Sequence, residues 1–277
     1  MSYSILCDSC TDFTTQLRSN DHYKLIPLTL HIGDYDIIDD DTFDQADFLK
    51  RVSEYPECPK SSCPSPESFM EHFDTAEDIY IVTLSSHLSG SYNSAELACK
   101  MYHEEHPDKK VHVFDSHTAS VGQTLIAMKI NELASSGLSF EEVIEQTDQF
   151  IATQGTKFVL ETLENLRKNG RLSKVSATVA SVLNIKPVMT GVSGQIDKLT
   201  QARGMKKAIQ KLAEAVKADA VNPQERILAI AHCNNAERAE YTKDEILKLI
   251  PFKEVYITDT AGISSLYAAD GGIIVSY

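Results

Sequence analysis

Short apolar runs alternate with longer segments of helical period along the first half of the chain. Four runs have the length and composition of β-strands: SILCDS (4–9), KLIPLTLHI (24–32), DIYIVTL (78–84) and KVHVFDS (110–116). The segments around 43–54, 66–76, 90–105 and 121–135 have the apolar spacing of helices. This alternation predicts an α/β fold with a mostly parallel sheet, in which ligands gather at the carboxyl ends of the strands.

A second series of elements follows the helix predicted for LSFEEVIEQTDQFIATQ (138–154), where Ser139 and Glu142 have the spacing of a capping box. Its strands are TKFVLET (156–162), a pair around a Ser-Gly turn in NIKPVMTGVSGQIDKLTQA (184–202), ILAIAHCN (227–234), FKEVYITDT (252–260) and GGIIVSY (271–277). Helices are predicted for GMKKAIQKLAEAVKA (204–218) and for the segment near 236–249. A further short apolar helix is predicted after a basic turn at 167–171. Because a single core stops growing at about 250–300 residues, we predict two α/β domains, 1–154 and 155–277.

The chain is acidic, with 26 Lys and Arg against 40 Asp and Glu and a formal net charge of −14. This balance argues against binding to nucleic acid, so a bound anion must meet a local site. No segment approaches the roughly 18 apolar residues of a membrane span, and the start MSYSILCDSC lacks the features of a signal peptide. We therefore expect a cytoplasmic protein without stable membrane insertion, whose six cysteines are reduced.

Hydroxyl side chains crowd the end of the third predicted strand, in LSSHLSGS (84–91). A hydroxyl-rich loop between a strand and a helix places N–H and Ser donors at the positive end of the helix dipole, which suits a carboxylate, a phosphate or an oxyanion. A second cluster, KSSCPSP (60–66), precedes a predicted helix. Ser65 and Pro66 suit the cap of that helix, which leaves Ser61 and Ser62 free to hold a small anion with the first loop.

Two other interpretations of the reactive side chains stay open. Ser89 with His87 or His117 as its base would make a serine-dependent hydrolase or acyl-transfer enzyme, although the GxSxG turn of such a nucleophile is missing. Cys7 and Cys10 have the CxxC spacing of a redox pair, with an Asp-Ser pair in the middle of the motif. No second CxxC or close Cys/His pair accompanies them, so we expect no metal site.

Two arginines stand at loops of the second predicted domain. Arg171 follows a glycine that can end a helix, and Arg203 precedes the start of the helix predicted at 204–218. A solvated surface position is the commoner fate of an arginine. In a chain this acidic, an arginine at a loop is also a natural counter-ion for a carboxylate or a phosphate.

Motifs along essentially the whole chain resemble those of the DegV family of bacterial fatty-acid-binding proteins. They are a DS-T-D element (Asp8, Ser9, Thr11, Asp12), a Lys-Thr-Ser-x-Pro-Ser loop (Lys60 to Ser65), an SSxLSGTY segment (Ser85 to Tyr92), a DS-x-x-A/S-x-G element in VFDSHTASVGQ (113–123), Gly-Arg-Leu-Ser in LRKNGRLSK (166–174) and Ile-Lys-Pro in NIKPVMT (184–190). Each motif alone is weak, and together they are specific.

The resemblance implies an EDD-type fold in which two α/β domains enclose one long-chain fatty acid of C16–C18 type, with no cofactor. Its acyl chain would occupy an apolar tunnel at the domain junction, and its carboxylate would be held by hydroxyl groups. The resemblance also implies a non-catalytic carrier, which presents the lipid to an ATP-dependent fatty acid kinase for acyl-phosphate formation. A neutral hydroxyl grip leaves the carboxylate oxygen free to attack ATP in such a partner.

The family's site residues are carried over by position. Ser61 stands where the family has a carboxylate-binding Thr, Ser89 where it has a carboxylate-binding Ser, and Ser62, Gly90 and Ser91 complete these two loops. Arg171 and Arg203 match arginines thought to contact the headgroup or the partner. Where family members that feed the kinase often carry a headgroup His near the C-terminus, this chain has AGISSLYAADGGIIVSY and no His after His232. Ser264, Ser265 and Tyr267 are the candidates for that role.

Overall fold

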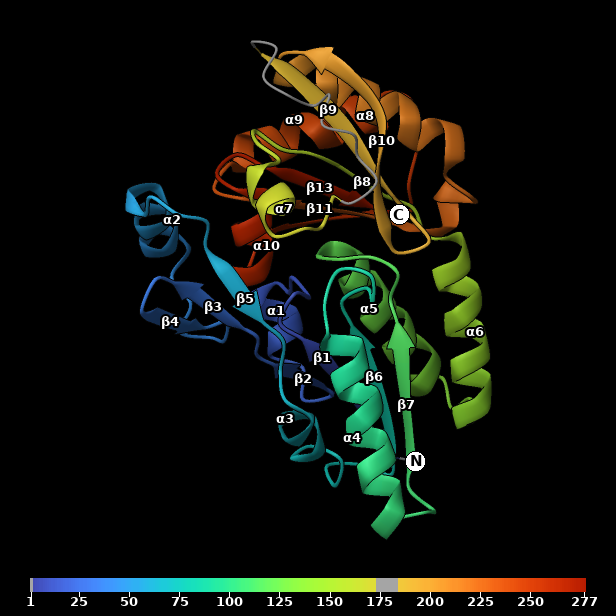
Figure 1. Ribbon diagram of the computed structural model, residues 1–277. Coiled ribbons are helices and arrows are strands. Elements are labelled where there is room, and N and C mark those ends of the chain that lie inside the picture. The colour runs from blue at the N-terminus through green and yellow to red at the C-terminus, as the bar shows by residue number, and fades with distance from the viewer. Residues whose placement is uncertain (1, 173–183) are drawn as a thin grey trace.

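A computed structural model describes residues 2–172 and 184–277 of the chain, as two layered halves joined through a shared helix (Figure 1). The first half contains a four-stranded parallel sheet of order β2-β1-β6-β7. Its strands are β1 (Tyr3–Asp8), β2 (Tyr23–Ile26), β6 (Asp78–Thr83) and β7 (Lys110–Asp115). Its helices are α1 (Thr15–Arg18), α3 (Pro66–Met70), α4 (Ser91–Glu105), α5 (Val121–Ser135) and α6 (Phe140–Thr153). The predicted parallel sheet is therefore confirmed.

The second half contains a six-stranded mixed sheet of order β10-β9-β8-β13-β11-β12. Its strands are β8 (Thr156–Val159), β9 (Ile185–Val192), β10 (Gln195–Arg203), β11 (Ile227–His232), β12 (Glu254–Asp259) and β13 (Ile273–Ser276). Its helices are α7 (Glu164–Lys168), α8 (Met205–Asp219), α9 (Ala236–Leu247) and α10 (Gly262–Ala268), with a short 3₁₀ turn at Pro223–Glu225. Only β11 and β12 pair in parallel among the described strands of this sheet.

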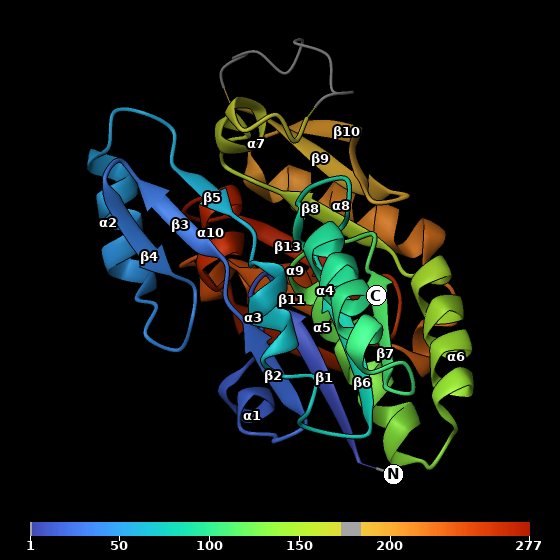
Figure 2. The same cartoon turned by 60° about the horizontal axis from the view of Figure 1, so that its bottom comes forward.

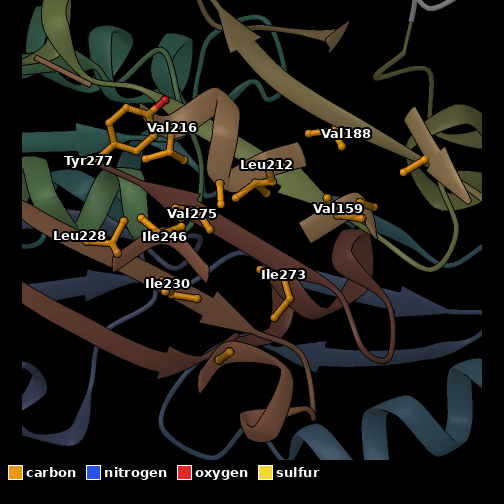
Figure 3. Close-up of a cluster of buried hydrophobic side chains, with 14 residues drawn as sticks. Val159, Val188, Leu212, Val216, Leu228, Ile230, Ile246, Ile273, Val275 and Tyr277 are labelled. Carbon is orange, nitrogen blue, oxygen red and sulfur yellow. The ribbon is translucent and has the colours of Figure 1, made fainter. Parts of the chain in front are cut away.

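The core of the second half lies between its sheet and helices α8 and α9. Figure 3 shows the aliphatic side chains of β8, β11 and β13 meeting Leu212 and Val216 of α8, with the ring of Tyr277 closing one side. All of the residues labelled there are at most 1% exposed. Each fully buried aliphatic side chain stabilises the fold by about 1.5–3 kcal/mol. This core therefore holds in place the strands of the second sheet, some of which line the cavity described below.

Helix α5 joins the two halves because it is buried against both sheets. One side of it packs on the first sheet through Ile126 and Ile130. Another side packs through Val121 and Leu125 against Ala229 and Ala231 of β11. A helix that is apolar nearly all round belongs in an interior, and small alanines let the helix approach the strand closely.

A third, three-stranded sheet was not predicted. It consists of β3 (Thr29–Ile32), β4 (Tyr35–Ile38) and β5 (Lys60–Ser62) in the order β4-β3-β5, and helix α2 (Gln45–Glu54) lies within the same segment. We call residues 29–62 the arm; it extends to one side of the molecule in both views (Figures 1 and 2). The single strand predicted for 24–32 is wrong, because Pro27 has no N–H for a sheet and divides it into β2 and β3.

The other sequence expectations have mixed outcomes. Ser139 and Glu142 form the predicted capping box at the start of α6. The helix predicted for 66–76 ends at Met70, and α10 was not predicted at all. The short apolar helix expected after the basic turn falls on 173–183, outside the described residues. The domain boundary at residue 154 stays a prediction; it falls in the short connection between α6 and β8.

Candidate functional site

An apolar cavity lies between the two halves and encloses about 760 Å³ of space, part of it open to solvent. That size is typical of sites for small molecules, which span about 300–1,000 Å³. Residues from β8, β10, β13 and α10 form its second-half wall, and loops after β1, β6 and β7 form the other. Its apolar lining includes Leu84, Leu88, Ala119, Phe158, Leu160, Leu166, Ile196, Ile263, Ala268 and Ile274.

A group of polar side chains surrounds the lining residues Arg171 and Tyr267, and we call this part of the cavity the Arg171 end. The Arg171 Nε donates to the carbonyl of Leu88 at 3.1 Å, and its guanidinium lies 5.8 Å from the centre of the Tyr267 ring. The Tyr267 hydroxyl lies 3.2 Å from the Ser61 Oγ. All of these side chains are half-buried. Among the described residues that line the cavity, Arg171 is the only Arg or Lys, so this end is the natural place for an anion.

The two serine loops meet beside the Arg171 end. The Ser94 Oγ donates to the carbonyl of Pro64 at 2.6 Å. A Cβ atom added to Gly90 would lie 3.1 Å from the Cys63 Sγ, which shows how closely the loops approach. Ser89 is half-buried, follows the lining residue Leu88, and accepts the N–H of Ser91 at 3.2 Å. The structure therefore brings together Ser61, Ser89 and Arg171, which lie far apart in the sequence.

Other predicted site residues lie elsewhere. Ser62 is exposed on the opposite face of β5 from Ser61, and Arg203 is exposed at the end of β10. Ser91 is fully buried at the start of α4. Ser265 is buried away from the cavity, where its hydroxyl lies 2.8 Å from the Thr260 Oγ1. Of the predicted headgroup residues, Arg171, Ser264 and Tyr267 line the cavity.

Two buried carboxylates bind the N-terminus of α10, the helix that carries Ser264 and Tyr267. Asp39, from the arm, accepts the N–H groups of Gly262 at 2.7 Å and Ile263 at 2.9 Å. Asp12, from the loop after β1, accepts the N–H of Ala261 at 2.6 Å. Carboxylates are favoured there because free N–H groups and the positive end of the helix dipole point at them.

Burial sets the ionisation of these two carboxylates. Asp12 and Asp39 are at most 1% exposed. Loss of hydration raises the pKa of Asp12 to about 7 and that of Asp39 to about 6, although their hydrogen bonds act in the opposite direction. Their neighbour Asp8 is also fully buried, and burial raises its pKa as well. The N–H of the cavity residue Cys10 donates to Asp8, so this acidic group lies next to the cavity lining, where it disfavours an anion when its carboxylates are ionised.

The redox interpretation of Cys7 and Cys10 finds no support in their surroundings. Both thiols are buried, and burial together with the charge of Asp8 holds their pKa values well above the ordinary value. Reactive thiols need the opposite, a lowered pKa and access to solvent. All six cysteines are free thiols. No cluster of three or more His, Cys, Asp or Glu suited to a metal ion occurs in the described ranges.

The hydrolase interpretation with Ser89 as nucleophile lacks its base. Within residues 2–172 and 184–277, no histidine hydrogen-bonds the Ser89 hydroxyl. His87 and His117 instead flank Gly194 at the tip of the β9–β10 hairpin, where a Cβ atom would lie 3.1 Å from each ring. Gly194 has a φ of +77°, and its carbonyl accepts the Ser85 Oγ at 2.7 Å. These residues hold the two halves together at the cavity wall.

Sequence analysis missed several residues of this region. Asp39 and the cavity residue Thr156 stand in no recognisable local motif, whereas Thr118, whose hydroxyl lies 2.7 Å from that of Thr156, belongs to the VFDSHTASVGQ segment. Ser120 did carry a signal, since it belongs to the VFDSHTASVGQ segment. It has a φ of +59° and donates to Asp12 at 2.5 Å. Such unusual backbone geometry clusters at functional sites.

Comparisons with known proteins agree on one family. A family model described as an uncharacterised protein of the DegV family matches residues 2–277. A DegV domain-containing protein of Streptococcus pneumoniae is 36% identical over 282 residues, which cover 100% of this chain and 99% of that protein. No helix in the described ranges is both long and apolar enough to cross a membrane.

Solved structures extend this similarity to the whole fold. A DegV family protein of Ruminococcus gnavus, refined with vaccenic acid, is 46% identical with a TM-score of 0.97, and the match covers 99% of each chain. The fatty acid kinase B3 protein of Streptococcus pneumoniae, loaded with linoleic acid, is 35% identical with a TM-score of 0.91, covering 100% of this chain and 99% of that one.

Proposed function

Because this chain belongs to the DegV family, we propose that it binds one long-chain fatty acid in the cavity between its two halves. The observation that carries the proposal is an apolar cavity in which Arg171 is the only Arg or Lys among the described lining residues, with Tyr267 and Ser61 close to it. An amphiphile with one small anionic head and a long apolar tail matches that arrangement. The proposal includes no cofactor and no metal.

The carboxylate should lie at the Arg171 end and the tail against the apolar lining. Arg171 supplies a positive charge there, and the half-buried hydroxyls of Ser61 and Tyr267 supply donors. The part of the wall around Ser264 is backed by Asp12 and Asp39, which would repel a carboxylate when ionised. The positive charge of Arg171 and the carboxylates behind Ser264 both favour a lipid carboxylate next to Arg171 over one next to Ser264.

Burial of the tail supplies most of the affinity. Each buried CH₂ group contributes about 0.8 kcal/mol, so the tail of a C16 acid offers roughly 11 kcal/mol before the costs of association. Hydroxyl groups and one half-buried arginine add specificity for the head. A saturated or singly unsaturated C16–C18 acid is therefore the proposed ligand.

Tyr267 takes the place of the headgroup histidine that the family often carries. It stands on α10 within the segment that lacks a histidine, and its hydroxyl reaches Ser61. Ser89 and the N–H groups of its loop complete the donors, with Ser264 facing the lipid deeper in the cavity. Ser62, Ser91, Ser265 and Arg203 have no headgroup contact in this arrangement.

We further propose that the protein carries its lipid to an ATP-dependent fatty acid kinase in the cytoplasm and has no catalytic part in that phosphoryl transfer. The similarity to the pneumococcal fatty acid kinase B3 protein supports this role. Hydroxyl groups that bind the carboxylate leave one of its oxygens nucleophilic, and a partner would supply ATP and its metal ion. The half-buried Arg171 and Tyr267 lie at the end of the cavity where such a partner needs access.

Native mass spectrometry of the purified protein tests lipid binding directly. We expect one co-purifying acid of about 250–285 Da, consistent with a ligand of C16–C18 length. Tyr267→Phe and Ser61→Ala should each weaken binding of added palmitate by about 10- to 150-fold, the value of one hydrogen bond to a charged group. Tyr241→Phe, remote from the cavity and hydrogen-bonded to Gln210, is the matched control. A protein that binds no fatty acid would refute the proposal.

Addition of a fatty acid kinase and ATP tests the carrier role separately. Acyl-phosphate should form only when lipid-loaded protein, kinase and ATP are all present, and Arg171→Ala should reduce its formation. Lipid binding without any acyl-phosphate would leave the binding proposal intact and refute the carrier role.

A further inference from the structure

A serine, a histidine and an aspartate form a hydrogen-bonded chain on the arm, away from the cavity. The Ser62 Oγ lies 2.9 Å from the His31 Nε2. The His31 Nδ1 lies 2.6 Å from the Asp36 Oδ1. These contacts have the order and the length of a nucleophile, its general base and the carboxylate that orients the base.

Strand geometry explains why the three side chains meet. His31 of β3 lies directly opposite Asp36 of β4, and it also lies opposite Lys60 of β5, two residues before Ser62. Alternate residues of a strand share a face, so His31, Asp36 and Ser62 are all on one face of the sheet. Leu30, between these positions, is fully buried on the other face. The strand register that buries the core of the arm therefore also fixes this hydrogen-bonded chain of three side chains.

The same face carries two further groups that suit an acyl substrate. Lys60 is exposed on the same face as Ser62, and its ammonium group forms no side-chain hydrogen bond or ion pair within the described ranges. Its ammonium group can stabilise an oxyanion or an anionic leaving group. Ile38 is 46% exposed and belongs to the same face as Asp36, so it offers an apolar contact for a short acyl chain.

We propose that Ser62 is a nucleophile for small activated acyl compounds, such as acyl phosphates and esters with good leaving groups. The Ser62 Oγ forms a bond to the acyl carbon while its proton passes to the His31 Nε2. The bond to the leaving group then breaks, and that group departs with the bonding electron pair and takes the proton. Water, deprotonated by His31, later attacks the O-acyl-serine, which releases the carboxylic acid and restores the Ser62 hydroxyl.

The openness of the site determines how it should behave. The Asp36 side chain is 63% exposed and that of His31 is 32% exposed, so water screens their interaction. A site that excludes little water gains less from its electrostatics than a buried triad. We therefore expect slow acylation that is readily detected as one adduct per chain, with little multiple turnover.

Covalent labelling of the full-length protein with a fluorophosphonate probe tests this inference. The probe forms a bond from phosphorus to the Ser62 Oγ and releases fluoride, and peptide mass spectrometry locates the adduct. We expect labelling at Ser62 in the native protein and none there in Ser62→Ala. His31→Asn should slow labelling by about tenfold or more, and Asp36→Asn by less, since general bases typically contribute 10²–10⁴-fold in enclosed sites.

Ser53→Ala is the matched control, because Ser53 is an exposed serine of the same arm without a histidine partner. It should label like the native protein. Labelling of Ser53 or Ser89 as fast as Ser62, or a Ser62 rate unchanged in His31→Asn, would overturn the inference. Circular dichroism of each variant shows whether the arm remains folded. The outcome does not depend on fatty-acid binding, so failure here leaves the proposed carrier role untouched.

Discussion

Replacement of Asp39 by Asn tests how the arm positions α10 at the cavity. The Asp39 carboxylate accepts two N–H groups at the start of α10 and also the Ser9 hydroxyl at 2.9 Å. Asparagine has the same shape, but an NH₂ group replaces one of the two oxygens. That group must face an N–H of Gly262 or Ile263, or the Ser9 hydroxyl, so one donor in the buried cluster loses its acceptor.

The size of the effect follows from that unpaired donor. An unsatisfied buried polar group costs about 1–3 kcal/mol, and loss of a hydrogen bond to a charged acceptor costs a similar amount. Relief of the burial of the Asp39 charge offsets part of the loss, because its pKa is raised to about 6. We expect Asp39→Asn to lower the free energy of unfolding by about 1–2 kcal/mol near neutral pH and to displace the first turn of α10.

Displacement of α10 moves Tyr267 away from Ser61, and so lipid affinity should fall as well. A loss of about 1–2 kcal/mol of binding free energy corresponds to a 5- to 30-fold weaker Kd for palmitate. Urea denaturation gives the first quantity, and titration of the delipidated protein with palmitate gives the second. Asp41→Asn is the control, because the Asp41 side chain is 84% exposed and contacts only Arg18 among the ion pairs of the described chain.

A double-mutant cycle separates positioning from a general loss of stability. If Asp39 acts through Tyr267, the effects of Asp39→Asn and Tyr267→Phe on Kd should be strongly non-additive. Purely additive effects, or a palmitate Kd for Asp39→Asn equal to that of Asp41→Asn, would refute the reasoning, whatever happens to stability.

Three further outcomes follow from the same structure. Burial raises the pKa of Asp12 from 3.8 to about 7, so between these two pH values the folded chain holds a proton that the unfolded chain has released. The contribution of Asp12 to the free energy of unfolding should therefore fall by on the order of 4 kcal/mol as pH rises through this range. In urea denaturation, Asp12→Asn should show a smaller loss of stability over the same pH range. Gly194→Ala should destabilise the protein in urea by about 1–3 kcal/mol, because φ is +77° and the new Cβ lies 2.5 Å from the Ser85 Oγ. Phe158→Ala, at the cavity wall, should cost about 3–5 kcal/mol in urea denaturation and shift the co-purifying acids toward longer chains in mass spectrometry.

The elements that sequence analysis predicted well are those with a strong local pattern. Strands β1, β6 and β11 are largely apolar runs because they are central in their sheets and buried on both faces. The capping box of α6 and the Ser65 cap of α3 were also predicted, since capping uses residues within three positions of one another. Arg171 was singled out as a counter-ion at a loop, and it lines the cavity.

The arm was missed because its strands are short and its pattern is weak. The β5 strand has three residues and none of them is apolar, and β4 is mostly exposed. Such strands are specified by their pairing with β3, which itself depends on the burial of Leu30 and Ile32 against α10 and the β6 loop. Propensity alone carries little information at such positions. The hydrogen-bonded chain of Ser62, His31 and Asp36 could not be predicted without that pairing.

Helix α10 shows why the Arg171 end of the cavity could not be predicted from local sequence patterns. Its seven residues, GISSLYA, include small residues and two serines that favour caps and turns over helix interiors. An isolated helix of that length is unstable in water. It forms here because Asp12 and Asp39, 249 and 223 residues away along the chain, accept its first N–H groups. The same two contacts set the position of Tyr267, so the buried carboxylates of Asp12 and Asp39 also position a residue of the proposed carboxylate site.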